Sequence, residues 1–141
     1  MIDLNNFIIT GKYGELEIGE TLDLVLTKLG PPDHQEPARK SYPEFLLYGP
    51  LELRFRDGKL EYIGLKVDYE SNIANHIDDC KNVYVKKKIF EVIELLLNNG
   101  VEYNADKIMT DYSQTVLVTK NSVHLAFDSD GFLSKIASVK K

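Results

Sequence analysis

The sequence predicts an α+β domain made of two tandem halves, with helices packed on one face of a mostly antiparallel sheet. Two segments with helical periodicity stand about 70 residues apart, strands follow each of them, and the last hairpins of the two halves share an apolar pattern. A chain of 141 residues has the usual length of one domain. We therefore predict a single domain, 1–141, with halves at about 16–69 and 87–139 and a linker at about 70–86.

Both predicted helices have an apolar stripe and a stop signal. The first follows Thr21, a good N-cap, and ends at Gly30 before two prolines. Its stripe has the spacing of one helical face: Leu22, Val25, Leu26 and Leu29. The second runs from about Lys87 to Asn98 with a broader stripe: Ile89, Val92, Ile93, Leu96 and Leu97. The broader stripe indicates that the second helix is the more buried one.

Alternating apolar residues bounded by turn residues predict the strands. We expect them at 45–48, 51–55, 60–67, 108–112, 115–119, 123–127 and 132–139.

The two final hairpins have the appearance of copies. The apolar spacing of 51–55 recurs at 123–127, and that of Leu60 and Ile63 recurs at Leu133 and Ile136. With left-handed glycines in a three-residue and a four-residue loop, at Gly58 and Gly131, both hairpins bury the same face. In that register Ile63 opposes Leu51, and Ile136 opposes Val123. This agreement predicts an internal duplication.

The same register assigns a mixed set of side chains to the other face of the sheet. It contains Glu52, Arg54, Leu60, Tyr62, His124, Ala126, Leu133 and Lys135. Antiparallel sheets often leave one face to water, so one interpretation is an ordinary solvated surface with a few apolar residues. Tyrosine is frequent at interfaces because it combines a large apolar area with a polar tip. A partner-binding face is the other interpretation.

Composition narrows the class of protein. Cys80 is the only cysteine, so an internal disulfide is excluded and a reducing compartment fits. The N-terminal residues do not have the pattern of a signal peptide, and the longest apolar stretch is far shorter than the ~20 residues of a membrane span. The net charge of −5 disfavours binding to nucleic-acid phosphates. We expect a cytoplasmic protein without a nucleic-acid or membrane partner.

Residues suited to catalysis or metal binding do not converge in the sequence. His34, His76 and His124 occur without a nucleophile elbow or a zinc-protease motif. His76 and Cys80 supply two of the four ligands of a structural zinc site. Residues 128–131 begin like a calcium loop but lack its later ligands, so we predict a turn there. We expect no catalytic residue, cofactor or metal site.

Two runs carry a resemblance to a known family: 19–32, which reads GETLDLVLTKLGPP, and 48–55, which reads YGPLELRF. They resemble small bacterial immunity-type proteins of polymorphic-toxin and contact-dependent growth inhibition systems. The tandem helix–loop–sheet layout is also similar to that of the beta-lactamase inhibitor protein, which docks its partner on a sheet surface. The resemblance is sharpest over 16–67 and looser over 87–139. It implies a cytoplasmic protein that binds and neutralises a toxin domain.

Our leading hypothesis is therefore an immunity-type protein that inhibits a toxin by tight binding, without catalysis. Its negative charge favours a basic toxin C-terminal domain as partner. The expected contact residues are Glu52, Arg54, Tyr62, His124 and Lys135. The alternative is a small-ligand-binding or regulatory module with no toxin partner, which an enclosed apolar pocket between helices and sheet would favour. An enzyme ranks third and requires polar groups that converge in a cleft.

Overall fold

The computed structural model describes residues 2–67 and 87–141. The helix α1 (Leu4–Thr10) precedes both predicted halves. The first half contains α2 (Leu22–Leu29), β1 (His34–Glu36), β2 (Glu44–Tyr48), β3 (Leu51–Arg56) and β4 (Lys59–Lys66). The second half contains α4 (Ile89–Asn98), β5 (Tyr103–Ala105), β6 (Gln114–Thr119), β7 (Val123–Asp128) and β8 (Leu133–Val139). The predicted linker at about 70–86, with His76 and Cys80, lies outside the described residues.

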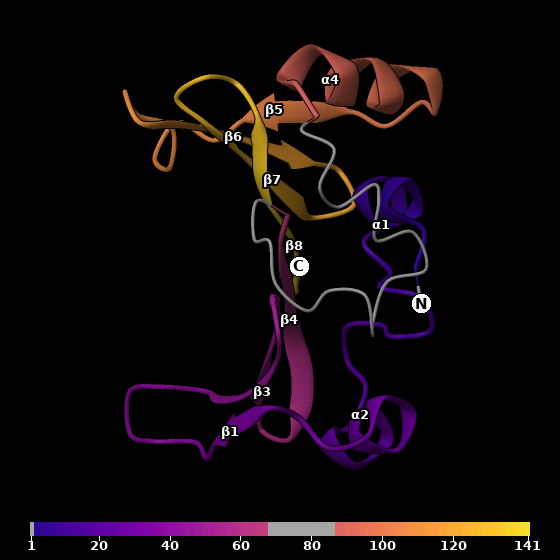
Figure 1. Ribbon diagram of the computed structural model, residues 1–141, viewed down its shortest axis with the longest axis vertical. Helices are drawn as coiled ribbons and strands as arrows, with labels where there is room; N and C mark the ends of the chain where they lie inside the picture. The colour runs from indigo at the N-terminus through magenta and orange to yellow at the C-terminus, as the bar shows by residue number, and fades with distance from the viewer. Residues whose placement is uncertain (1, 68–86) are drawn as a thin grey trace.

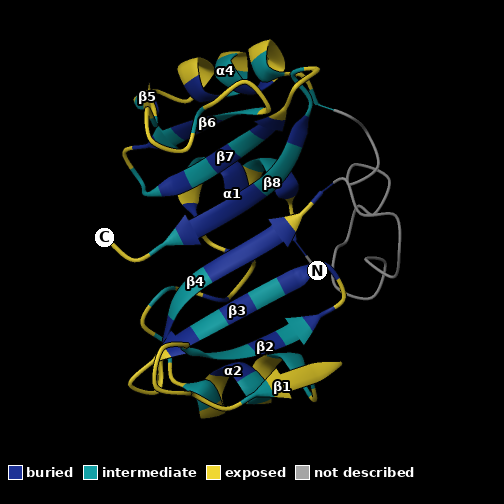
Figure 2. Ribbon diagram, turned by 90° about the vertical axis from the view of Figure 1, so that its left-hand side faces the viewer, coloured by how far each residue is buried: buried dark blue, intermediate teal, exposed yellow. Residues whose placement is uncertain are grey.

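All eight strands form one antiparallel sheet in the order β1-β2-β3-β4-β8-β7-β6-β5, which confirms the predicted α+β class. Each half is a four-stranded meander, and the two meanders join where β4 pairs with β8. In Figure 1 the helices α1, α2 and α4 all lie on the right-hand side of the sheet. Figure 2 looks onto the opposite side, which we call the open face. No helix in the two described ranges is long and apolar enough to cross a bilayer.

One core joins the helices to the sheet. It includes Phe7 and Ile8 of α1, Val25 of α2 and Val92 of α4, which pack with fully buried strand residues from both halves. On β3, buried Leu51, Leu53 and Phe55 alternate with partly exposed residues, and the corresponding positions of β7 do the same. This period of two separates a helix-covered face from the open face.

The predicted hairpin register is wrong by two residues, although the predicted buried face is right. Ile63 pairs with Leu53, and Ile136 pairs with Leu125. Gly58 and Gly131 do adopt positive φ, but the first loop has two residues, 57–58, because Arg56 pairs with Lys59. A type I′ turn of this kind fits the twist of a two-residue hairpin.

A β-bulge lies at the same place in both hairpins, and because of it the open face contains fewer residues than predicted. The register shifts between Arg54 and Phe55, and again between Ala126 and Phe127. Each bulge leaves one extra residue in the returning strand, so residues three apart point to the same side. Leu60 and Leu133 were predicted on the open face, and they are instead buried in the core.

Elsewhere the helix α2 has its predicted bounds, with Thr21 Oγ1 accepting a hydrogen bond from the backbone N–H of Leu24. The sequence did not predict α1, β1 or β5. The predicted strand 108–112 is wrong, because these residues belong to a loop between β5 and β6. Leu97, predicted within the buried stripe of α4, is 64% exposed.

The β4–β8 junction pairs equivalent positions of the two halves. Gly64 follows Leu60 by four residues, as Ala137 follows Leu133, and Gly64 and Ala137 are Cα partners across the junction. Both are buried although they belong to the open face. The two smallest residue types therefore face each other in the middle of this face.

Candidate binding site on the open face

The five predicted contact residues lie together on the open face. Each is partly buried and occupies a strand position that alternates with core residues: Glu52, Arg54, Tyr62, His124 and Lys135. They come from the four central strands β3, β4, β8 and β7. The sequence-based grouping of these residues on one face is therefore correct.

Tyr62 forms the centre of this group. The Arg54 guanidinium carbon lies 4.1 Å from the centroid of its ring, and the Lys135 ammonium lies 5.3 Å from it. Both distances are within the range of cation–π attraction. Arg54 also donates from Nε and Nη2 to Glu52 Oε2, at 3.0 and 2.7 Å. Four of the five residues thus hold each other in position.

Gly64 allows the Tyr62 ring to lie flat on the sheet. A Cβ atom at position 64 would come within 2.5 Å of Tyr62 Cε1 and within 2.6 Å of its hydroxyl oxygen. The ring therefore covers the glycine, which explains why Gly64 is buried on an otherwise open face.

Two adjoining hollows flank this centre. The larger, of about 380 Å³, is lined by Arg54, Tyr62, Met109, Gln114, Val116, His124, Ala126, Lys135, Ala137 and Val139. The smaller, of about 150 Å³, is lined by Leu47, Gly49, Pro50, Glu52, Gly64, Lys66 and Lys135. Four predicted contact residues line the larger hollow and Glu52 lines the smaller, so both hollows belong to one surface.

Lys66 and Lys135 are Cα partners across the β4–β8 junction. Within the described residues neither has a carboxylate at ion-pair distance, and Glu52, which lines the same hollow, is held by Arg54. Like charges directly opposite each other in a sheet are unfavourable. The described residues that line the two hollows thus carry more positive than negative charge, in a chain whose net charge is negative.

The β5–β6 loop (residues 106–113) forms one border of the open face and is held by many hydrogen bonds. Thr110 Oγ1 accepts from Val116 N at 2.9 Å, and Asp106 Oδ1 accepts from the N–H groups of Ile108 and Met109. Asp111 Oδ1 accepts from the backbone and hydroxyl of Ser113, which lowers the pKa of the Asp111 carboxyl. These contacts fix the loop backbone.

This loop presents large apolar side chains to solvent. Tyr112 is 97% exposed, Ile108 is 92% exposed and Met109 is half exposed. Tyr42 is also exposed, and it belongs to the β1–β2 loop (residues 37–43), closed by reciprocal backbone hydrogen bonds between Arg39 and Tyr42. Figure 1 shows both loops projecting on the left of the sheet, away from the helices. The two loops therefore border the open face at its two ends.

The β5–β6 loop was not predicted from the sequence, because its apolar residues were assigned to a strand. The available signal was the pair Asp106 and Asp111, since aspartate side chains favour turns by accepting hydrogen bonds from the N–H groups two residues later. Both aspartates form such turns in the structure.

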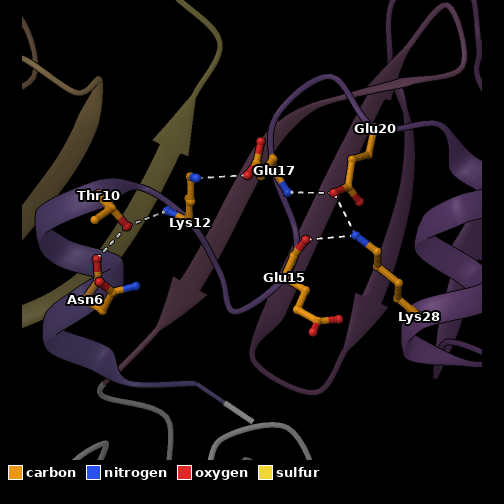
Figure 3. Close-up of polar contacts among 7 residues, drawn as sticks. All are labelled: Asn6, Thr10, Lys12, Glu15, Glu17, Glu20 and Lys28. Atoms are coloured by element: carbon orange, nitrogen blue, oxygen red, sulfur yellow. Dashed lines mark hydrogen bonds and ion pairs between the residues drawn. The ribbon is translucent and has the colours of Figure 1, made fainter.

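A second polar cluster connects α1, α2 and the segment between them (Figure 3). The Lys28 ammonium donates to Glu20 Oε1 and to the Glu15 carbonyl, each at 2.8 Å, and Glu20 Oε1 also accepts from Glu17 N. Lys12 forms an ion pair of 2.9 Å with Glu17. No histidine, cysteine or serine takes part in these contacts. These contacts therefore hold the segment between the two helices in place.

The remaining candidates do not form a reactive site in the described parts of the chain. His34 contacts Glu36 at 2.8 Å on the exposed edge strand β1, and His124 lies on β7. Asp128 Oδ1 accepts from the N–H groups of Asp130 and Phe132, as the predicted turn requires. No group of three or more potential metal ligands occurs in 2–67 or 87–141.

Comparison of the chain with protein-family models, with curated proteins and with solved structures finds no match.

Proposed function

We propose that this chain is an immunity-type protein of the cytoplasm, which neutralises a toxin domain by docking it on the open face of the sheet. One observation carries the proposal: a fixed loop holds Ile108 and Tyr112 almost fully exposed beside a hollowed sheet face. Exposed apolar residues grouped at a polar face are typical of protein interfaces. The resemblance of 16–67 to immunity-type proteins supports the toxin as the partner.

The loop geometry favours tight binding. Ordering a mobile loop on association costs free energy, and a loop that is already held by its own hydrogen bonds avoids much of that cost. Tyr62 has the same advantage, because Arg54 and Gly64 fix its ring before any partner arrives. Aromatic residues held in this way are frequent among the few that dominate an interface.

Copurification tests the proposal. The tagged protein is coexpressed with the C-terminal domain of the protein encoded by the neighbouring gene, and any complex is isolated at high salt. We expect a one-to-one complex and protection of cells from the toxin. Tyr62→Ala should weaken binding by ~2 kcal/mol or more, and the double variant Ile108→Ser/Tyr112→Ser should abolish protection.

The matched control uses the other exposed apolar residues. Phe90 and Leu97 of α4 are 61% and 64% exposed on the helical side of the sheet. The variant Phe90→Ser/Leu97→Ser removes a similar apolar area and should leave binding unchanged. If this control abolishes binding while the loop variant does not, the docking face is wrong.

A small-ligand-binding module is the second candidate, and the larger hollow favours it. Its volume of about 380 Å³ falls within the range of ligand sites, and its lining combines apolar residues with Arg54 and His124. A ligand that copurifies with the wild type and is lost in Tyr62→Ala, in the absence of a protein partner, would support this function instead.

A further inference from the structure

We propose that the two hollows of the open face bind an acidic segment of the protein partner, with its carboxylates against Lys66 and Lys135. This inference rests on the proposed function, because it names the chemistry of the surface that the open face recognises. It differs from the expectation drawn from the overall charge, which favours a basic partner.

Local charge is the first argument. The formally charged side chains lining the two hollows are Arg54, Lys66, Lys135 and Glu52. Glu52 and Arg54 neutralise each other through two hydrogen bonds to one carboxylate oxygen. The two lysines remain as the positive charge of the surface, so a partner with carboxylates is the complementary one.

The position of the two lysines is the second argument. A sheet selected for stability alone would place opposite charges at a directly facing pair, yet Lys66 and Lys135 face each other at the β4–β8 junction. Departures from a local rule that lower stability are expected at functional sites. A bound carboxylate would remove the repulsion between the two ammonium groups.

The shape of the surface is the third argument. Gly64 lines the smaller hollow together with the two lysines, and Ala137 lines the larger hollow. The larger hollow has an apolar lining that includes Val116, Ala126 and Val139. A segment in which acidic residues alternate with aliphatic ones fits this combination, since its two kinds of side chain find charged and apolar surroundings respectively.

The net charge of the chain and the local charge of the two hollows act over different distances. The net charge of −5 contributes to the long-range field that guides encounter, whereas short-range pairs decide which groups are accepted in the contact. A partner that is basic overall and presents an acidic segment to the open face satisfies both.

The first test is a titration of the isotope-labelled protein with a capped heptapeptide of alternating glutamate and valine, followed by NMR. We expect shifts of amide resonances in β4 and β8, and an affinity that falls as salt is added. The same peptide with glutamine in place of glutamate should bind at least about tenfold more weakly, a loss of ~1.4 kcal/mol. Equal affinity of the two peptides would overturn the proposal. Equal affinity of free glutarate would also overturn it, in favour of a small-ligand site.

The second test changes one lysine. Lys66→Glu places opposite charges at the junction and keeps the contact of Lys135 with Tyr62, so its Tm should rise while its affinity for the glutamate peptide falls at least about tenfold. Opposite effects on stability and binding cannot arise from partial unfolding. The control Lys120→Glu makes the same charge change at an exposed position beyond β6 and should leave affinity unchanged. Equal losses in both variants would show that only overall charge matters.

The same variants separate this inference from the proposed function. If the toxin domain binds Lys66→Glu as tightly as the wild type but does not bind Tyr62→Ala, the docking face stands and the acidic segment is wrong. If the glutamate peptide binds as expected and no toxin domain is captured, the acidic specificity stands and the immunity function is wrong.

Discussion

Tyr13 and Tyr48 are buried, whereas Tyr42 and Tyr112 are largely exposed, so one residue type serves both the core and the surface of this protein. Burial raises the pKa of both buried phenols above their ordinary value, and the nearby Asp33 carboxylate adds to the effect at Tyr48. The Tyr48 hydroxyl donates to the Gly30 carbonyl at 2.8 Å, which ties β2 to the end of α2.

These phenols predict a loss of stability at alkaline pH. Above the ordinary tyrosine pKa of ~10, the unfolded chain releases the two protons while the folded chain keeps them. The free energy of unfolding is therefore fully retained below that pH and falls as the pH rises above it. Urea denaturation between pH 8 and 11 should show this fall, and Tyr13→Phe should reduce it.

Tyr112→Phe is the matched control, because it removes a phenol that is 97% exposed. The expected outcome is that this variant follows the wild type while Tyr13→Phe does not. Identical slopes for all three proteins would contradict the assignment of the alkaline transition to the buried phenol.

Residue chemistry was sufficient to group the five predicted contact residues on one face, because the period of two along a strand assigns faces without knowledge of the rest of the fold. It was not sufficient to describe their contacts. The contacts of Tyr62 with Gly64 and with the cations of Arg54 and Lys135 depend on the position of β4 between β3 and β8, and strand order is not encoded in local periodicity. The approach of Lys66 to Lys135 was missed for the same reason.

The three helices differ in the side-chain hydrogen bonds that their N-terminal backbone N–H groups receive. In α2, Thr21 accepts a hydrogen bond from Leu24 N at 3.3 Å. In α1, Asp3 accepts from two backbone N–H groups, whereas Lys88 at the start of α4 provides no such bond. The helix with the largest apolar content therefore depends on packing and the other two on their caps as well.

This difference predicts an unequal response to alanine at the caps. Thr21→Ala should lower the free energy of unfolding by about 1 kcal/mol, because a backbone donor of α2 loses its partner. Lys88→Ala removes no cap hydrogen bond and should change it by less than about 0.5 kcal/mol. Chemical denaturation of both variants measures the two effects, and equal losses would contradict the role of the Thr21 hydroxyl.

Elements with local signals were predictable and those fixed by tertiary contacts were not. Caps, stops and alternation defined α2, β2, β3 and β7. The short β1 and β5 have three residues each, and their assignment depends on pairing with β2 and β6. The bulges were indicated by the three-residue spacing of Leu60 and Ile63, which a regular strand cannot place on one side; the predicted register did not use that signal.

At the scale of the whole molecule, the two halves share one core and one sheet. Leu65 of β4 and Ile136 of β8 are both fully buried and face each other across the junction. Among the described residues, core side chains of both halves therefore belong to one hydrophobic cluster.

This arrangement predicts that both halves unfold together. Leu65→Ala should lower the free energy of unfolding by about 2–5 kcal/mol and keep a single transition. Hydrogen exchange should then report a similar drop in opening free energy for amides of β3 and of β7. The surface variant Leu97→Ala should have little effect on the free energy of unfolding or on the opening free energies of these amides. Protection of β7 that persists after β3 has opened would contradict a shared cooperative unit.

The pairing of Gly64 with Ala137 has a consequence for the symmetry of the fold. When equivalent positions of two repeats face each other across antiparallel strands, a local two-fold axis passes between them, perpendicular to the sheet. An interface with this symmetry is isologous, the type found in most homodimers. Two identical copies of one half, meeting in this register, would regenerate the eight-strand order. The chain thus has the geometry of a symmetric dimer whose two subunits are joined in one polypeptide, and positions such as Tyr62 and Lys135, which this axis relates to each other, are where the side chains depart from that symmetry.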